Sequence, residues 1–270
     1  MSVFDEMGIY WAEIADHNPT QRQIEFIKNI VKPTGLVLDL ACGTGRHIIP
    51  LNKEGYEVVG LDLSRSLLKI AKNRLRSDQL VRGDMRRLPF IPEVFAAAVS
   101  MDTSFGYLPT QQEDMQSLRE LRKTLRQDGL LIIDVFNREH LTRKYKADRR
   151  FKLVLLPLLL KLGFSGKWLL SRFYKWREYP SFYLLQKRTI DTNGEKLSDM
   201  WIVRDKVNGE IIVFKHVVRL YQLHGLEEAL NEADFAVKRV LGGYEGQPLS
   251  HDSDRLILIA SAEGSLHCQG

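Results

Sequence analysis

The stretch Val37-Leu38-Asp39-Leu40-Ala41-Cys42-Gly43-Thr44-Gly45-Arg46-His47 decides the fold. Its apolar beginning at 36–40 predicts a short strand, which runs into a turn with two glycines, and a helix follows through Leu51. A glycine-rich turn between a strand and a helix lets a ligand approach the backbone, because no Cβ atom intervenes. The N-terminus of the helix also favours an anionic group. This stretch therefore predicts an α/β unit with a ligand site at the turn.

Strands and helices alternate on both sides of this stretch. A helix is predicted from Asn18-Pro19, which suit a helix start, to Lys32-Pro33, which end it. Downstream, strands are predicted at 57–61, 80–82, 95–101 and 130–135, with helices at 65–75 and 113–125. Because these strands are apolar on both faces, they indicate a parallel, doubly wound sheet.

The pattern changes after Asn137. Residues 140–180 are predicted to be helical and basic, and three strands follow at 183–190, 197–204 and 210–221. Asn193-Gly194 and Asn208-Gly209 separate these strands, and Asn-Gly favours hairpins because both residues tolerate positive φ. We therefore expect an inserted antiparallel meander, then a helix at 226–233 and closing strands at 237–241 and 255–260. The predicted division is a core of residues 1–139 and 222–270 and an inserted cap on the substrate side at 140–221.

Positive charge is concentrated in one segment of the 270-residue chain, whose net charge is +5. Residues 140–180 carry 11 Lys and Arg against Asp148 and Glu178, so the rest of the chain is acidic overall. This argues against a globally basic nucleic-acid binder. Three uses fit the segment: an amphipathic helix on an anionic membrane, an RNA or phosphate patch, or a lid and self-association element with a solvated basic face.

The two cysteines, Cys42 and Cys268, are too few for a disulfide scaffold, and no Cys/His cluster has the spacing of metal ligands. The N-terminus lacks the features of a signal peptide, and the longest apolar run, 153–160, is interrupted by Pro157 and cannot span a bilayer. We therefore expect a cytoplasmic protein without a metal, with peripheral membrane association through 140–180 as an additional option.

Polar loops follow the predicted parallel strands at the edge where such sheets bind ligands. Asp62 ends the second strand, where a carboxylate can accept both ribose hydroxyls, and Gly83-Asp84 end the third, beside a purine edge. The fourth strand ends in the loop 101–107. Since the carboxyl ends of parallel strands meet at one edge, these loops predict a nucleoside site.

The first loop narrows the kind of nucleoside. A dinucleotide site prefers a third glycine where this chain has Ile48, and Asp39 would repel a pyrophosphate. The chain also lacks the GxxxxGK[ST] pattern of a triphosphate site. An acidic residue beneath the loop suits a cationic ligand that carries an amino group.

The motifs DLACGTGRH (39–47), GLDLS (60–64), RGDMRRLPF (82–90) and TSFGY (103–107) resemble those of class I S-adenosylmethionine-dependent methyltransferases. They are most similar to the small-molecule N- and O-methyltransferase branch related to glycine and amino-sugar N-methyltransferases. The resemblance covers 36–137 strongly and 220–262 loosely; Phe95-Ala96 and Ala233-Asp234-Phe235 depart from the family pattern. It implies a Rossmann-like seven-stranded sheet in the order 3-2-1-4-5-7-6 with the seventh strand antiparallel, S-adenosylmethionine as cofactor and S-adenosylhomocysteine as product.

The resemblance also implies roles for individual residues. The methionine moiety would be lined by Asp39, Ala41, Gly43 and Gly45. Asp62 would hold the ribose and Leu63 would touch the adenine. Gly83, Asp84 and Met85 would meet the adenine edge, and Met101 would lie near the sulfonium.

The acceptor side is less defined. In similar methyltransferases an aromatic N-terminal segment covers the cofactor, so Tyr10 is a candidate cofactor contact and Trp11 a candidate substrate contact; packing on the sheet edge is the alternative. Phe105 and Tyr107 are candidate substrate contacts, because aromatic faces attract a sulfonium and exclude water. No catalytic acid or base is evident, and the candidates by residue type are Tyr10, Asp102, Tyr107, His140, His216 and His251.

Methyl transfer to N or O of a small molecule is the function these features favour. Two alternatives stay open: RNA or protein methylation through 140–180, and a cofactor-binding module without catalysis. Methyltransferases that flip bases usually carry a DPPY- or NPPY-like element after the fourth strand, where this chain has MDTSFGY, so we do not expect a nucleic-acid partner.

Overall fold

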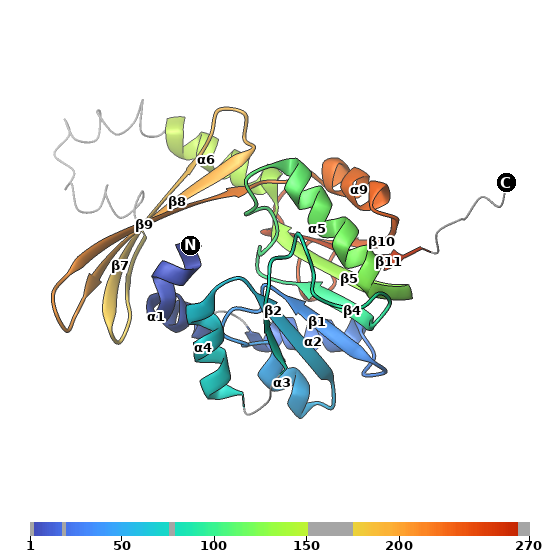
Figure 1. Cartoon of the computed structure of the whole chain (residues 1–270). Coiled ribbons are helices and arrows are strands. Elements are labelled where there is room, and N and C mark those ends of the chain that lie inside the picture. Colours follow the sequence, from blue (N-terminus) through green and yellow to red (C-terminus); the bar gives the residue numbers. More distant parts are fainter. Residues whose placement is uncertain (1–2, 18–19, 76–78, 151–174, 264–270) are drawn as a thin grey trace. The chain divides into compact units, whose positions relative to one another are not determined.

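The computed structural model describes residues 3–17, 20–75, 79–150 and 175–263. The predicted helix start at 18–19 and the greater part of the basic segment, 151–174, lie outside these residues. The chain divides into two compact units, one formed by Met1–Asn137 with Tyr221–Gly270 and the other by Arg138–Leu220 (Figure 1).

The first unit is built on a seven-stranded sheet in the order β10-β11-β5-β4-β1-β2-β3. Its strands are β1 (Leu36–Leu40), β2 (Glu57–Asp62), β3 (Leu80–Arg82), β4 (Phe95–Ser100), β5 (Leu125–Phe136), β10 (Phe235–Leu241) and β11 (Arg255–Ala262). Strands β1 to β5 pair in parallel, whereas β11 is antiparallel to both of its neighbours. With β10 and β11 counted as the sixth and seventh strands, this is the expected order 3-2-1-4-5-7-6, and the Rossmann-like α/β fold is confirmed.

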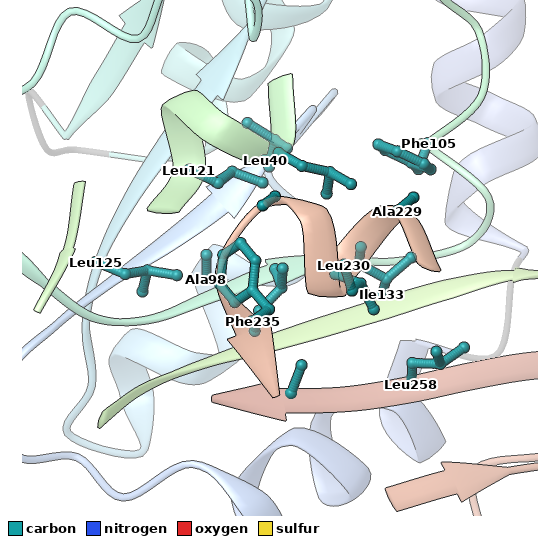
Figure 2. Close-up of a cluster of buried hydrophobic side chains, with 14 of the residues drawn as sticks. Leu40, Ala98, Phe105, Leu121, Leu125, Ile133, Ala229, Leu230, Phe235 and Leu258 are labelled. Carbon is teal, nitrogen blue, oxygen red and sulfur yellow. The ribbon is translucent and has the colours of Figure 1, made fainter. Parts of the chain in front are cut away.

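Helices cover both faces of this sheet, because its strands carry apolar side chains on both sides. The helices are α1 (Val3–Asp16), α2 (Thr20–Ile30), α3 (Ile48–Lys53), α4 (Arg65–Arg74), α5 (Gln111–Thr124) and α9 (Leu223–Glu232). One buried cluster packs α5 and α9 on the sheet and contains Phe105, Phe235 and Leu230 (Figure 2). A second cluster joins α2, α3 and α4 to the opposite face through residues such as Ile27 and Leu51. The two clusters hold the carboxyl edge of the sheet in place.

Helix α5 begins with a capping box. Thr110 Oγ1 accepts a hydrogen bond from the Glu113 amide at 3.2 Å, and Glu113 Oε2 accepts one from the Thr110 amide at 2.9 Å. We expect Thr110→Ala to lower the free energy of unfolding by ~1 kcal/mol, because the Glu113 amide loses its acceptor. Urea denaturation measures this loss, and Thr110→Ser, which keeps the hydroxyl, should stay within a few tenths of a kcal/mol of the wild type. Equal losses in both variants would contradict the capping role.

Helix α1 was not predicted from the sequence. Gly8 has φ +39° and kinks the segment, so no continuous helical period of apolar residues is visible. Tertiary contacts hold the helix on α4: Asp5 Oδ1 accepts hydrogen bonds from the Ser66 amide at 3.0 Å and from Ser64 Oγ at 2.9 Å. In the last turn of α1, the helix also buries Ile14 and Ala15.

The second unit contains α6 (Arg138–Arg150) and a four-stranded antiparallel sheet in the order β6-β7-β8-β9. Its strands are β6 (Lys175–Glu178), β7 (Phe182–Ile190), β8 (Lys196–Asp205) and β9 (Ile211–Arg219). The meander of three strands is present, but the helical prediction for 140–180 is wrong at 175–178. There Trp176 pairs with Leu185 and stacks on Tyr183, so sheet pairing replaces helix.

Both Asn-Gly turns join strands as expected, but with different geometry. Only Gly194 and Gly209 have positive φ, both +73°, whereas a type I′ turn would require it at the asparagines as well. The turns are longer and are closed by carboxylates: Asp191 Oδ1 accepts from the Glu195 amide, and Asp205 Oδ1 from the Val207 amide, each at 2.7 Å.

Within the described ranges, no helix is long and apolar enough to cross a bilayer.

Candidate active site

The turn after β1 has the conformation expected of a loop that exposes its backbone to a ligand. Ala41, Gly43 and Gly45 all have positive φ, at +59°, +55° and +73°. A Cβ on Gly43 would lie 4.0 Å from Trp11 Nε1, whereas a Cβ on Gly45 would lie 3.0 Å from Leu75 Cδ1. Gly45 is therefore required for packing against the end of α4, and Gly43 is the glycine that leaves space beneath α1.

Asp62 lies directly beside this loop. Its Oδ2 accepts a hydrogen bond from the Gly43 amide at 2.8 Å, and its Oδ1 accepts one from the Ser64 amide at 2.7 Å. Burial raises the pKa of Asp62, the two amides partly oppose this, and the neighbouring charges of Asp39 and Asp5 raise it further. The structure thus brings together two residues that the sequence predicted to share a site, and it places them in a negative environment.

Asp39, at the end of β1, is the second buried carboxylate of this site. Only 1% of its surface is exposed, and its Oδ2 atom has no hydrogen-bond partner. Burial raises the pKa of the adjacent Cys42 thiol well above its ordinary value, and the charges of Asp39 and Asp62 raise it further. Because a buried, unsatisfied carboxylate oxygen is costly, this arrangement suits a ligand that brings a cationic donor.

A polar network that the sequence did not predict lies beneath the loop. The Gln23 amide is fully buried, and its Nε2 donates to the Tyr244 hydroxyl at 2.8 Å. Its Oε1 accepts from Arg46 Nη1 at 2.7 Å and from His47 Nε2 at 3.0 Å. Since arginine only donates, the Gln23 oxygen is fixed on that side, and His47 Nε2 must carry a proton. The other ring nitrogen, Nδ1, then faces Asp39 Oδ2 at 3.8 Å.

The network continues to the β4 loop through Asp134, which is completely buried in β5. Asp134 Oδ2 accepts from the Tyr244 hydroxyl at 2.7 Å and from the Asp102 amide at 2.8 Å, and its Oδ1 accepts from Arg255 Nε at 2.6 Å. Burial and the Asp134 charge raise the pKa of Tyr244. Asp102 and Thr103 have φ of +57° and +62°, so Asp134 holds a strained turn at the carboxyl edge. In the sequence, the sign of this network is one charged residue, Asp134, within the otherwise apolar strand at 130–136.

Asp102 itself pairs with the glycine loop. Its Oδ2 lies 3.0 Å from Arg46 Nη2, and Arg46 also donates to Thr20 Oγ1 at 2.9 Å. The side chains of Arg46 and Asp102 are 11% and 29% exposed, so this ion pair is partly sheltered from solvent. Arg46 therefore joins α2, the glycine loop and the β4 loop. In this arrangement the Asp102 carboxylate binds Arg46.

The residues expected at the adenine lie at the same edge of the sheet, but they differ in their exposure to solvent and in their contacts. Asp84 pairs with Arg86, whose Nη2 lies 2.6 Å from Asp84 Oδ2, and this guanidinium lowers the pKa of the carboxyl. Leu63 is 48% exposed, and Met85 is partly buried against the core. A Cβ on Gly83 would lie 2.9 Å from the Leu61 side chain, so this glycine is required for packing.

Aromatic side chains from α1 and the β4 loop lie together. Phe4 contacts both Trp11 and Tyr107 edge-on, with ring centroids 5.2 Å apart in each pair. Tyr10 is half-buried on the same helix. Phe105, in contrast, is 1% exposed and packs in the hydrophobic core (Figure 2). Its ring centroid lies 5.4 Å from that of Tyr221.

The remaining candidates are dispersed. Met101 is buried at the end of β4, and His251 is exposed in the loop before β11. His140 and His216 belong to the Arg138–Leu220 unit. Among the described residues, no group of His, Cys, Asp and Glu is arranged to hold a metal ion.

Comparisons with known proteins agree with this architecture. Residues 37–129 match the methyltransferase-domain family. Putative methyltransferase YqeM of Bacillus subtilis is 30% identical over 136 residues, 49% of this chain and 55% of that protein. The dTDP-3-amino-3,4,6-trideoxy-alpha-D-glucopyranose N,N-dimethyltransferase of Streptomyces venezuelae is 33% identical over 110 residues, 41% of this chain and 46% of that protein. The chain thus spans about half the length of these relatives.

Among solved structures, the CcbJ methyltransferase of Streptomyces caelestis has the same fold, with a TM-score of 0.74 at 16% identity over 98% of this chain and 99% of its own. The order of the strands defines a Rossmann-like fold. Residues 37–129 therefore form a methyltransferase domain, within a fold shared with S-adenosylmethionine-dependent methyltransferases, for which S-adenosylmethionine is the cofactor.

Proposed function

We propose that this protein transfers a methyl group from S-adenosylmethionine to a nitrogen or oxygen of a small-molecule acceptor. The observation that carries the proposal is the buried, unpartnered Oδ2 of Asp39 beside Gly43 and Asp62. The amino-sugar N,N-dimethyltransferase among the relatives supports an acceptor of small size.

Each residue of the first loops has a proposed task. Asp39 would accept from the ammonium group of the methionine moiety, either directly or through water, because its free oxygen needs a donor. Asp62 would accept from the ribose hydroxyls with the lone pairs that the Gly43 and Ser64 amides leave unused. When bound, the cofactor supplies an electrophilic methyl group on its sulfonium.

The acceptor side of the proposal rests on the aromatic cluster of Phe4, Trp11 and Tyr107. Aromatic faces attract cations and keep water away from a reactive sulfonium. We assign acceptor selection to the Arg138–Leu220 unit, since the residues proposed for the cofactor all belong to the other unit. An amine that binds in its neutral form would need orientation and proximity more than a general base.

Mass spectrometry of labelled product tests this function. The purified protein and methyl-labelled cofactor would be incubated with a cell extract separated into small-molecule, RNA and protein fractions. We expect the label in a small molecule that gains one methylene unit. Label confined to RNA or protein, or cofactor binding without any turnover, would contradict the proposal and identify one of its two alternatives.

Cofactor affinity should depend on the protonation of Asp62. Burial raises the pKa of this carboxyl above its ordinary value of 3.8, and a bound cation favours its charged form. As the pH falls through this raised pKa, the carboxyl takes up a proton, so affinity for S-adenosylmethionine should decrease at a higher pH than an ordinary aspartate would cause.

The matched variant for this measurement is Asp62→Asn. Loss of the charged contact should weaken binding at neutral pH by about tenfold or more, corresponding to ~1.5–3 kcal/mol, and should remove the acid-dependent step. Calorimetric titrations of both proteins between neutral and acid pH measure the two effects. An unchanged affinity in the variant would remove Asp62 from the cofactor site.

A further inference from the structure

The sheet of the Arg138–Leu220 unit has two unlike faces. Alternate residues of its strands are buried, as in the pairs Leu184 and Gln186 of β7 and Trp201 and Val203 of β8. The residues between them point to the opposite side, which we call the outer face. This face is defined by four registered rows across the sheet, which begin at Tyr183, Leu185, Lys187 and Thr189 of β7.

One row of the outer face is entirely apolar. Strand register aligns Trp176, Leu185, Ile202 and Val213 across all four strands. Trp176 is 60% exposed and Val213 50%, and Ile211 and Val217 on β9 are 65% and 48% exposed. Of the eight large hydrophobic residues that are exposed in the described part of the chain, five belong to this unit. The exposed apolar surface is therefore concentrated here.

The charges without an ion-pair partner that flank the apolar row are all positive. Lys187 and Lys215 lie in the next row on either side of Met200, and Arg204 lies between Tyr183 and Ile211. None of these three cations pairs with a carboxylate among the described residues. The one carboxylate on the described outer positions, Glu178, is already bound to Lys206 Nζ at 2.8 Å.

We propose that the outer face docks on an anionic lipid bilayer. Lys and Arg near such a surface each contribute about 1 kcal/mol of attraction, while an exposed tryptophan and aliphatic side chains can enter the interfacial region. Unpaired cations on both sides of an apolar row match a surface that offers negative charge with hydrocarbon beneath it. This inference does not depend on the methyl acceptor.

The same observations disfavour two other occupants. A second copy of the chain, paired face to face about a two-fold axis, would bring two sets of Lys187, Arg204 and Lys215 into one interface without unpaired carboxylates to balance them. A single-stranded nucleic acid would need free aromatic rings for base stacking. Here Tyr183 is stacked on Trp176 and has Lys206 Nζ 4.6 Å from its ring centroid.

Vesicle co-sedimentation of the full-length protein tests the proposal. We expect the wild type to sediment with vesicles of phosphatidylcholine and phosphatidylglycerol, in a salt-sensitive manner, and not with phosphatidylcholine alone. The triple variant Lys187→Gln/Arg204→Gln/Lys215→Gln should bind the anionic vesicles about a hundredfold more weakly. Trp176→Ser should also weaken binding, but without changing its salt dependence.

A matched control separates the face from net charge. Lys53, Lys69 and Lys238 are exposed residues of the other unit, and their replacement by glutamine removes the same charge. We expect this control to bind vesicles like the wild type. Equal losses in the two triple variants, equal binding to neutral and anionic vesicles, or no vesicle binding by the wild type would overturn the proposal. The proposal would also be overturned if the wild type formed a dimer in light scattering, or bound RNA, and only the Lys187/Arg204/Lys215 variant lost that property.

Discussion

Gly43→Val is expected to abolish S-adenosylmethionine binding, with a loss in affinity on the order of a hundredfold or more. Gly43 has φ +55°, which a β-branched residue adopts only with strain, and its amide donates to Asp62 at 2.8 Å. A valine side chain would also enter the space between the loop and Trp11. The variant therefore combines a distorted loop, a displaced carboxylate and a filled approach to the backbone.

The chain offers a control that separates strain from blockage. Gly55 also has positive φ, at +85°, but a Cβ there would meet nothing within 4 Å. Gly55→Val should lower the free energy of unfolding by ~1–3 kcal/mol and leave cofactor affinity unchanged. Calorimetry and thermal melting of both variants distinguish the two effects. If Gly43→Val binds the cofactor like the wild type, the glycine loop is not the cofactor site.

The second large effect is expected at Asp134. Its replacement by alanine would leave the guanidinium of Arg255 buried without its counter-ion, which costs ~3–5 kcal/mol of the free energy of unfolding. The Asp102 amide and the Tyr244 hydroxyl would also lose their acceptor, because they donate to Asp134 Oδ2 at 2.8 and 2.7 Å. Urea denaturation measures the loss, and cofactor affinity should fall as the β4 loop loosens.

An exposed ion pair provides the comparison for Asp134. Asp16 binds Arg74 through two contacts of 2.7 Å, but the two side chains are 43% and 34% exposed. Asp16→Ala should therefore cost less than ~1 kcal/mol. The double variant Asp134→Leu/Arg255→Met should recover much of the stability lost in Asp134→Ala, because no charge is left buried and unpaired. A small loss in Asp134→Ala itself would show that the buried network contributes little to stability.

Local sequence patterns were sufficient for most of the central sheet. Strand β1 and its glycine turn were predicted because apolar residues, glycines and the following helix are consecutive in the chain. Helix α1 and strand β6 were missed, since Gly8 interrupts the first and the second is four residues long. Both depend on partners distant in sequence: Asp5 binds Ser66, and Trp176 pairs with Leu185. Tertiary pairing of this kind leaves no periodic signal.

The candidate site divides in the same way. Gly43 and Asp62 follow consecutive strands, so parallel pairing alone predicts that they meet. Gln23 and Tyr244 lie 221 residues apart in sequence, and their hydrogen bond could not be inferred from spacing. Phe105 shows the opposite difficulty, because an aromatic residue in a polar loop reads as a ligand contact although this one completes the core. Side-chain direction within a loop is set by packing, which residue type does not reveal.

A crystal structure of the protein with S-adenosylhomocysteine tests the central claim most directly. We predict that the ribose hydroxyls bind the Asp62 carboxylate and that the amino group lies within hydrogen-bond reach of Asp39, directly or through one water. In that structure the Gly43 backbone would run beside the methionine moiety, beneath Trp11. A ligand bound elsewhere, or one at this edge that contacts neither Asp39 nor Asp62, would contradict the proposed site.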